Sequence, residues 1–308
     1  MLSAAEGILL FISTTESVLG ILGDVFIGFV NCNDYIKNKK LSKIGFIISG
    51  LTISRICLVL LLIIDAYAKL FSGQLPSFVN LTEHISYLWL IINNLSVLFA
   101  TSLSVFYFLK IANFSHHMFL WLKRRINVVF IFLIGCLLIT WLLSFPLLGK
   151  LIQDDKRNTS QQVPIKKSEL IIDYVFVNAG VIFYFMVALT ASFLLIISLW
   201  RHSRRMQSHV SGFRDLNTEA HVKAMKILIS FIILYILYFI GIAIDLSCLF
   251  IPENKLLFIF GLTIACMYPC CHSLILILTN SQLKQSSVRV LQRLKRCEKG
   301  RDLRARAT

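Results

Sequence analysis

Seven long apolar runs are the feature that most constrains how this chain can fold. They cover residues 7–30, 44–67, 85–109, 126–149, 170–200, 227–250 and 256–280. A helix that crosses a lipid bilayer needs about 20 predominantly apolar residues. Because lipid offers no hydrogen-bond partner to a polypeptide backbone, runs of this length predict helices. The sequence therefore predicts an all-α fold, a bundle of seven transmembrane helices.

The overall composition also indicates a membrane protein. Hydrophobic residues make up 57% of the 308 residues and charged residues 15%, whereas soluble domains are about half apolar and a quarter charged. No Pro/Gly-rich linker, internal repeat or low-complexity tract divides the runs, so we expect a single domain over residues 1–308. The first six residues carry no Lys or Arg, so we expect the first run to remain as a helix and not to act as a signal peptide.

Basic residues predict the orientation of the bundle. Most of the 31 Lys and Arg fall in segments 31–43, 110–125, 201–226 and 281–308, and few fall in 1–6, 68–84, 150–169 and 251–255. Basic loops stay on the cytoplasmic side of a membrane, which predicts an extracellular N-terminus and a cytoplasmic C-terminus. The net charge of +15 then belongs mainly to the cytoplasmic face, and no nucleic-acid partner is needed to explain it.

Two glycosylation sequons fall on the predicted extracellular side. Asn158 opens "NTS" and Asn80 opens "NLT", and both are expected to be accessible to glycosylation. The sequons at Asn94 and Asn113 lie within a helix and on the cytoplasmic side, so neither is expected to be used. None of the eight Cys lies in an extracellular segment. We therefore expect no extracellular disulfide framework, no metal site and no cofactor.

The tail "LKQSSVRVLQRLKRC" follows the seventh run directly. Helical spacing places five residues near one face, with basic residues around them: Ser287, Val290, Leu291, Leu294 and Cys297. This pattern predicts a short amphipathic helix on the cytoplasmic leaflet, with Cys297 as a candidate for acylation. A solvated basic tail is the alternative interpretation.

The chain carries no enzyme signature. Neither HExxH, nor GxSxG, nor a Gly-rich phosphate loop is present, and these motifs mark the common hydrolase and nucleotide sites. His272 and Ser273 are adjacent, but neighbouring residues on a helix point about 100° apart and do not face each other. We therefore do not expect an enzyme.

An acidic and a basic residue inside the predicted spans suggest a buried ion pair. Arg55 is eleven residues from Ile44, about 16 Å into the second span, and Asp24 is six residues from Val30, about 9 Å from the same side. Charges inside a membrane face protein or water, so a direct pair between the first and second helices is expected. The rival arrangement is a protonated Asp24 bonded to the seventh helix near Ser273, with Arg55 paired elsewhere.

The stretch "LWLIINNLSVLF" places two amides, Asn93 and Asn94, in the middle of an apolar span. Spacing by three and four residues joins them to one broad stripe that consists of Ser86, Trp89, Leu90, Asn93 and Asn94. A mixture of apolar groups with a few polar ones is typical of a small-molecule pocket. Amides also link neighbouring helices in membranes, and the residues alone leave both interpretations open.

Five motifs carry a resemblance to a known family. They read "ISRIC", "ATSLSVFYFLKIANFS", "SLWRHSRRMQ", "RDLNTEAHVKAMK" and "HSLILILTNSQLKQ", in this order along the chain. Together they resemble the taste receptor type 2 family, the bitter taste receptors, over the whole chain. Within the family the resemblance points to the branch of taste receptor type 2 member 10 and its rodent relatives. Asp24 departs from the family, which usually has Asn there.

The resemblance implies a multi-pass receptor of the plasma membrane that binds bitter small molecules and activates a gustducin-type heterotrimeric G protein. Trp89, Asn93 and Asn94 are similar to the positions with which the family lines its agonist site. Facing candidates on later helices are Phe183, Tyr238 and Leu262, which follows Gly261. Asp24, Arg55, His272 and Ser273 are expected to serve activation or structure.

A ring of basic residues is expected where a G protein would dock on the cytoplasmic side. It consists of Lys110, Arg201, Arg204, Arg205, Lys223 and Lys226. Anionic headgroups of the lipid bilayer are alternative partners for such a ring. A heptahelical channel or transporter is the competing function, although the paired halves typical of many transporters are not visible in the sequence.

Overall fold

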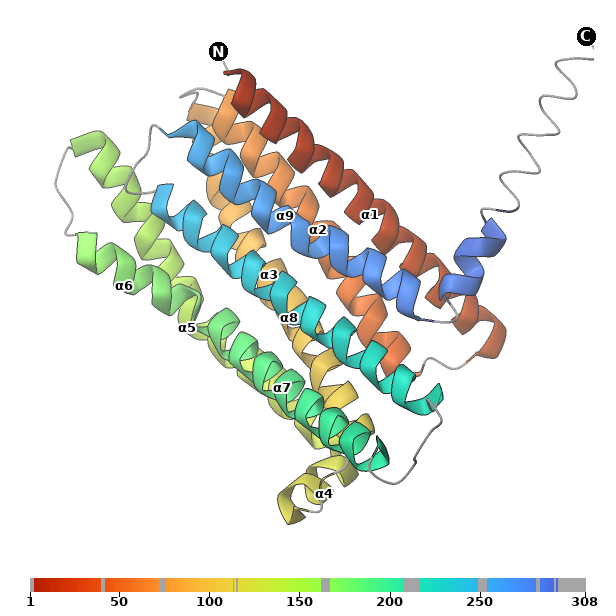
Figure 1. Cartoon of the computed structure of the whole chain (residues 1–308). Coiled ribbons are helices and arrows are strands. Elements are labelled where there is room, and N and C mark those ends of the chain that lie inside the picture. The colour runs from red at the N-terminus through yellow and green to blue at the C-terminus, as the bar shows by residue number, and fades with distance from the viewer. Residues whose placement is uncertain are drawn as a thin grey trace, which may run out of the picture.

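The computed structural model describes residues 3–39, 42–71, 76–112, 114, 116–161, 167–207, 216–248, 254–280, 283–290 and 292. The helices labelled in Figure 1 are α1 (Ala4–Asn38), α2 (Lys43–Phe71), α3 (Pro76–Ile111), α4 (His117–Arg124), α5 (Ile126–Gln161), α6 (Lys167–Val177), α7 (Ala179–Gln207), α8 (Leu216–Cys248) and α9 (Lys255–Thr279). The first helix begins with a capping box: Ser3 Oγ accepts from the backbone N–H of Glu6, whose carboxylate accepts from the N–H of Ser3.

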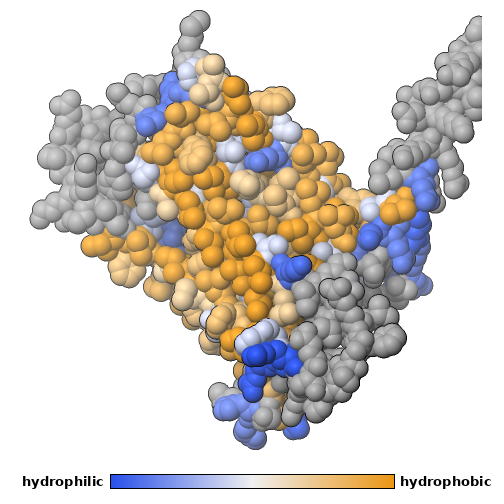
Figure 2. Space-filling model, in the orientation of Figure 1, coloured by the Kyte–Doolittle hydropathy of each residue, from blue (hydrophilic) through white to orange (hydrophobic). Residues whose placement is uncertain are grey.

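The prediction of seven membrane-spanning helices is confirmed. Within the described residues, seven helices are long and apolar enough to cross a membrane: Ala4–Lys37, Lys43–Leu70, His84–Ile111, Ile126–Gln153, Ala179–Arg201, Met225–Ile244 and Lys255–Thr279. Figure 1 shows them as one elongated bundle, in which the chain begins at one end and α9 finishes at the other. Figure 2 shows a broad apolar surface over the middle of the bundle, with hydrophilic residues gathered toward its ends.

The fifth span differs from the single helix predicted over residues 170–200. α6 and α7 meet at Asn178, which belongs to neither helix. The side-chain amide of Asn178 donates to the carbonyl oxygen of Tyr174 at 3.0 Å, and the backbone N–H of Asn178 donates to the same oxygen at 3.1 Å. Asn side chains that bond to nearby backbone groups compete with helix continuation. The interruption is confined to Asn178, because its carbonyl oxygen accepts from the backbone N–H of Ile182 at 3.0 Å and i→i−4 bonding continues on both sides.

Contacts among the helices place α3 and α9 at the centre of the bundle. α9 packs against α1, α2 and α8, and α3 packs against α2, α5 and α7. Polar bonds join neighbouring helices within this packing. Tyr184 donates from its hydroxyl to the carbonyl oxygen of Leu133 at 2.8 Å, and Thr101 donates to the carbonyl oxygen of Tyr184 at 3.0 Å. These two bonds tie α7 to both α5 and α3.

The predicted amphipathic tail is described only in part. Residues 283–290 are helical and follow α9 at the end of the bundle opposite the start of α1. Leu283 is buried against the bundle, whereas Val288 and Val290 are exposed. The remaining residues of the predicted apolar face, Leu291, Leu294 and Cys297, lie outside the described residues.

The two predicted glycosylation sites lie in helical backbone, although loops were expected there. Asn80 falls in the second turn of α3, and Asn158 falls in the last turn of α5. Both helices extend beyond the apolar runs at their ends, since a polar segment continues a helix once its first turns exist. The side chains of both Asn lie outside what the structure describes.

Candidate functional site

A cavity of about 520 Å³ opens at the end of the bundle where α1, α3 and α9 begin. We call it the large cavity. Residues of α2, α3, α5, α6, α8 and α9 line it, together with Asn178 at the break between α6 and α7. Five predicted ligand-binding residues are in this lining: Ser86, Trp89, Leu90, Tyr238 and Leu262.

Asn93 lies behind the wall of the large cavity. Its side chain is fully buried, at 0% exposure, and its Oδ1 accepts a hydrogen bond from the hydroxyl of Tyr238 at 2.5 Å. Because Tyr238 lines the cavity, the amide holds this tyrosine in place from the far side. The bond also links α3 to α8, so Asn93 forms the interhelical contact that was the alternative to a ligand contact.

Asn94 faces a different helix. Its Nδ2 donates to the carbonyl oxygen of Leu90 at 2.8 Å. Its Oδ1 lies 2.9 Å from the point that a Cβ on Gly180 would occupy. Glycine at position 180 therefore allows α7 to approach Asn94 closely. The structure directs Asn94 toward α7 and does not include it in the lining of the large cavity.

Phe183 is not brought to the large cavity. Its side chain is 39% exposed, and its ring packs edge-on against Tyr184 with 5.4 Å between centroids. Phe183 was predicted because it is aromatic, and residue type alone does not set the direction of a side chain. Tyr174 and Asn178 line the cavity from this segment instead, and the polar Asn178 was the sequence signal for this part of the lining.

Charged groups gather at one side of the large cavity. Asp65 and Lys69 both line it and form an ion pair at 2.7 Å across one helical turn. The Lys69 ammonium also lies 5.2 Å from the centre of the Phe258 ring. Trp89, Leu90, Leu262 and other largely apolar residues line the remainder. Apolar walls with a few polar groups are the usual chemistry of a small-molecule site.

The predicted ion pair between Asp24 and Arg55 is wrong. Ser273 Oγ and Asp24 Oδ1 are hydrogen-bonded at 2.6 Å, whereas Arg55 Nη1 bonds to His272 Nδ1 at 2.9 Å. His272 and Ser273 are neighbours on α9 and point to different sides, so each holds its own partner. We call these four buried residues the polar junction. It joins α9 to α1 through Asp24 and to α2 through Arg55. These hydrogen-bond partners are those of the rival arrangement, in which Asp24 bonds near Ser273 and Arg55 pairs elsewhere.

The bond to Arg55 fixes the proton on His272. A guanidinium offers only N–H donors, so Nδ1 of His272 must be the acceptor, and the ring proton must be on Nε2. The imidazole is therefore neutral in this arrangement. Its ring stacks on Phe231 with centroids 4.2 Å apart, and the Arg55 guanidinium carbon lies 4.8 Å from the centre of the Tyr268 ring. Rings from α8 and α9 thus enclose the pair.

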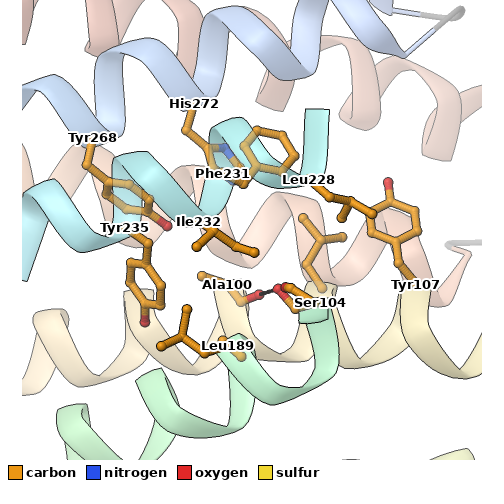
Figure 3. A pocket seen from close by; sticks show the side chains of 13 residues that line it. Ala100, Ser104, Tyr107, Leu189, Leu228, Phe231, Ile232, Tyr235, Tyr268 and His272 are labelled. Atoms are coloured by element: carbon orange, nitrogen blue, oxygen red, sulfur yellow. Dashed lines mark hydrogen bonds between the residues drawn. The ribbon is translucent and has the colours of Figure 1, made fainter. Parts of the chain in front are cut away.

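A second, much smaller cavity of about 40 Å³ adjoins the polar junction (Figure 3). Residues of α3, α7, α8 and α9 line it, and His272 and Tyr268 belong to the lining. Figure 3 shows the His272 ring next to the Phe231 ring and Tyr235 near Tyr268, with Ser104 bonded to the carbonyl oxygen of Ala100 in its own helix. The volume suffices for a few water molecules and not for a drug-sized ligand.

Four members of the predicted basic ring are exposed: Lys110 on α3, Arg201 and Arg204 on α7, and Lys226 on α8, next to the start of the membrane span at Met225. The Lys110 ammonium lies 5.5 Å from the centre of the Phe106 ring, and the Arg204 guanidinium carbon lies 5.1 Å from that of Trp200. The side chains of Arg205 and Lys223 lie outside the described residues.

Known proteins resemble this chain over nearly its full length. The family model described as Taste receptor protein (TAS2R) matches residues 1–295. Taste receptor type 2 member 114 of Mus musculus is 65% identical over 99% of both chains, and its Rattus norvegicus counterpart is 63% identical over 99% of both. Taste receptor type 2 member 105 of Mus musculus is 62% identical over 96% of this chain and 99% of its own. The chain therefore belongs to the taste receptor type 2 family, whose members are G-protein-coupled receptors and not enzymes.

Proposed function

We propose that the large cavity binds bitter small molecules and that their binding activates a gustducin-type G protein at the opposite end of the bundle. The observation that carries the proposal is the cavity itself. Its volume of about 520 Å³ falls in the range of small-molecule sites, about 300–1,000 Å³. Trp89 and Tyr238 offer aromatic surface, while Ser86 and Asn178 offer hydrogen bonds.

The orientation completes the proposal. An extracellular N-terminus, indicated by the distribution of basic residues, places the large cavity on the extracellular side of a plasma membrane. Lys110, Arg204 and Lys226 then lie on the cytoplasmic side, where an acidic surface of a G protein can dock. The whole chain acts as one receptor domain in this proposal, within the branch of taste receptor type 2 member 10 and its rodent relatives.

A calcium assay in cells with a chimeric G protein tests agonist binding. The compounds are denatonium, a cation, salicin, a neutral glucoside, and saccharin, an anion, followed by a broader bitter panel. Ser86→Trp adds bulk to the cavity and is expected to abolish the response. The matched control is Leu88→Trp, two residues away on an exposed face of α3, and it should respond like wild type at equal surface level.

Two results would contradict the cavity assignment. If the wild-type receptor reaches the cell surface but gives no calcium response to any bitter compound, the result argues against a bitter-receptor function. A Ser86→Trp variant with unchanged dose-response curves argues against the site. Ion current through the purified protein without any G protein would instead favour the competing channel function.

Nucleotide exchange on purified G proteins tests the coupling. We expect the activated receptor to accelerate exchange on gustducin more than on a stimulatory G protein. Reversal of charge at Lys226→Glu is expected to weaken the exchange, because an acidic partner surface would then be repelled. Equal exchange on both G proteins would contradict the gustducin preference, and unchanged exchange by Lys226→Glu would remove this residue from the docking face.

Glycosylation provides a separate test of orientation. We propose that Asn158, and secondarily Asn80, carry N-linked glycan on receptors delivered to the cell surface. Glycosidase treatment is expected to increase gel mobility, and Asn158→Gln is expected to remove most of that change. Mobility that is unaffected by the enzyme would count against both sites.

A further inference from the structure

The Ser273 hydroxyl has one proton to donate but lies within hydrogen-bond distance of two oxygen atoms that could accept it. Its Oγ lies 2.6 Å from Asp24 Oδ1 and 2.8 Å from the carbonyl oxygen of Pro269. A serine hydroxyl has one proton to donate and two lone pairs to accept with. The carbonyl oxygen of Pro269 can only accept. Both short contacts are fully satisfied when Asp24 is the donor in one of them.

The environment of the second carboxyl oxygen of Asp24 also favours a protonated carboxyl group. Asp24 is 1% exposed, and its Oδ2 is buried with no hydrogen-bond partner among the described residues. An ionised carboxylate seeks several donors, and a buried charge without them is costly. A neutral carboxylic acid tolerates this environment better, since it carries no charge to desolvate.

Arg55 supplies the third observation. Its side chain is 0% exposed, and its Nε and Nη2 have no hydrogen-bond partner in the part of the chain that the structure describes. A guanidinium beside an ionised carboxylate usually forms short, often bidentate bonds with it. Arg55 bonds instead to the neutral ring of His272, although its charge acts on Asp24 electrostatically. That Arg55 bonds to His272 and not to Asp24 is consistent with an uncharged Asp24 carboxyl group.

We propose that Asp24 holds a proton inside the bundle, which makes the α1–α9 contact a proton-binding site. The Asp24 carboxyl donates to Ser273 Oγ, and Ser273 donates to the carbonyl oxygen of Pro269. The titratable or charged groups that face Asp24 are Arg55 on α2 and Cys270 on α9. The bound proton keeps Arg55 on His272, because an ionised Asp24 would compete for the guanidinium. It thereby ties α9 to α1 and α2 at the same time.

Infrared difference spectroscopy on the purified full-length receptor in lipid nanodiscs tests the proposal. Wild type minus Asp24→Asn is expected to show the carbonyl stretch of a protonated carboxyl group, shifted downward in D₂O. The matched control is Asp65→Asn, because Asp65 forms an ion pair with Lys69 and should give only carboxylate bands. A carboxylate band in the Asp24 difference spectrum, without the carbonyl stretch, would overturn the proposal.

The thermal inactivation rates of two variants provide a second measurement. Asn resembles a neutral carboxylic acid in shape and can donate to Ser273, so Asp24→Asn is expected to inactivate within about 2-fold of the wild-type rate. Asp24→Ala leaves buried polar groups unpaired and is expected to inactivate about 5-fold faster or more. Equal acceleration by the two substitutions would mean that the charge of Asp24 is what the bundle requires, and the proposal would fail.

Discussion

The large cavity and the polar junction lie in the same bundle and share α2 and α9, yet they are built in opposite ways. The large cavity is hollow, and its ion pair, Asp65–Lys69, is partly exposed. The polar junction is buried, and the side chains of Asp24 and Arg55 are at most 1% exposed. An exposed ion pair contributes little to stability, whereas buried polar groups must find partners. We infer that substitutions in the large cavity mainly change ligand binding, and that substitutions in the polar junction mainly change the stability of the folded bundle.

The largest effect is expected from the loss of the buried cation. Arg55→Ala removes the bond to His272 and the contact with Tyr268. It leaves a cavity in place of a fully buried side chain and an unpaired His272 Nδ1, and it is expected to destabilise the bundle by about 3–5 kcal/mol. The measurement is thermal unfolding of the purified receptor together with its surface level. Lys69→Ala removes a partly exposed cation and serves as the matched control, with an expected cost of about 1 kcal/mol or less. Similar losses for both would abolish the distinction between the two regions.

The second-largest effect is expected from loss of the hydrogen bond between the buried Asn93 and Tyr238 in the wall of the large cavity. Asn93→Ala leaves the Tyr238 hydroxyl without its partner, which is expected to cost about 1–3 kcal/mol of stability and to lower agonist potency, because the cavity wall at Tyr238 is no longer held. Tyr238→Phe breaks the same hydrogen bond from the cavity side. The double variant should therefore lose less than the sum of the two single losses. Additive losses would show that Asn93 and Tyr238 act separately.

A smaller shift is expected for an aromatic residue in the lining. Trp89→Ala removes apolar surface from the large cavity and should weaken an agonist by about 1–2 kcal/mol, or about 5- to 30-fold in potency. Phe183→Ala removes an aromatic ring that is outside the lining. Its dose-response curve should overlay that of wild type at matched surface level. A loss with Phe183→Ala equal to that with Trp89→Ala would restore the prediction that Phe183 contacts the agonist.

The smallest effect concerns the packing of α7. Gly180→Ala would place a methyl group 2.9 Å from Asn94 Oδ1 and 2.9 Å from Thr140 Cβ, and the required shift is expected to cost about 1 kcal/mol. Gly135→Ala is the control, because a Cβ there meets nothing within 4 Å. Differential thermal unfolding should separate the two variants. Gly135→Ala should match wild type or exceed it slightly, since alanine favours a helix.

Apolar length and polar spacing made the helices and part of the cavity predictable. Each long apolar run became a membrane-spanning helix, except that the fifth begins only at Ala179. The stripe on α3 placed Ser86, Trp89 and Leu90 correctly on one face, because helical period fixes direction within a helix. The same period could not tell what lies opposite each residue. Asn93 was expected to meet an agonist, and the structure places Tyr238 between it and the cavity.

The sequence by itself determined how many helices cross the membrane and which family the motifs resemble. Both follow from local properties, namely hydrophobic length and residue order. Only the tertiary structure decided the partners of the buried polar groups. Asp24 bonds to Ser273 and Arg55 bonds to His272, although depth along the helices allowed Asp24 and Arg55 to pair directly. Depth fixes one coordinate of a side chain, whereas hydrogen bonds also depend on the rotation and separation of helices, which the packing of the whole bundle sets.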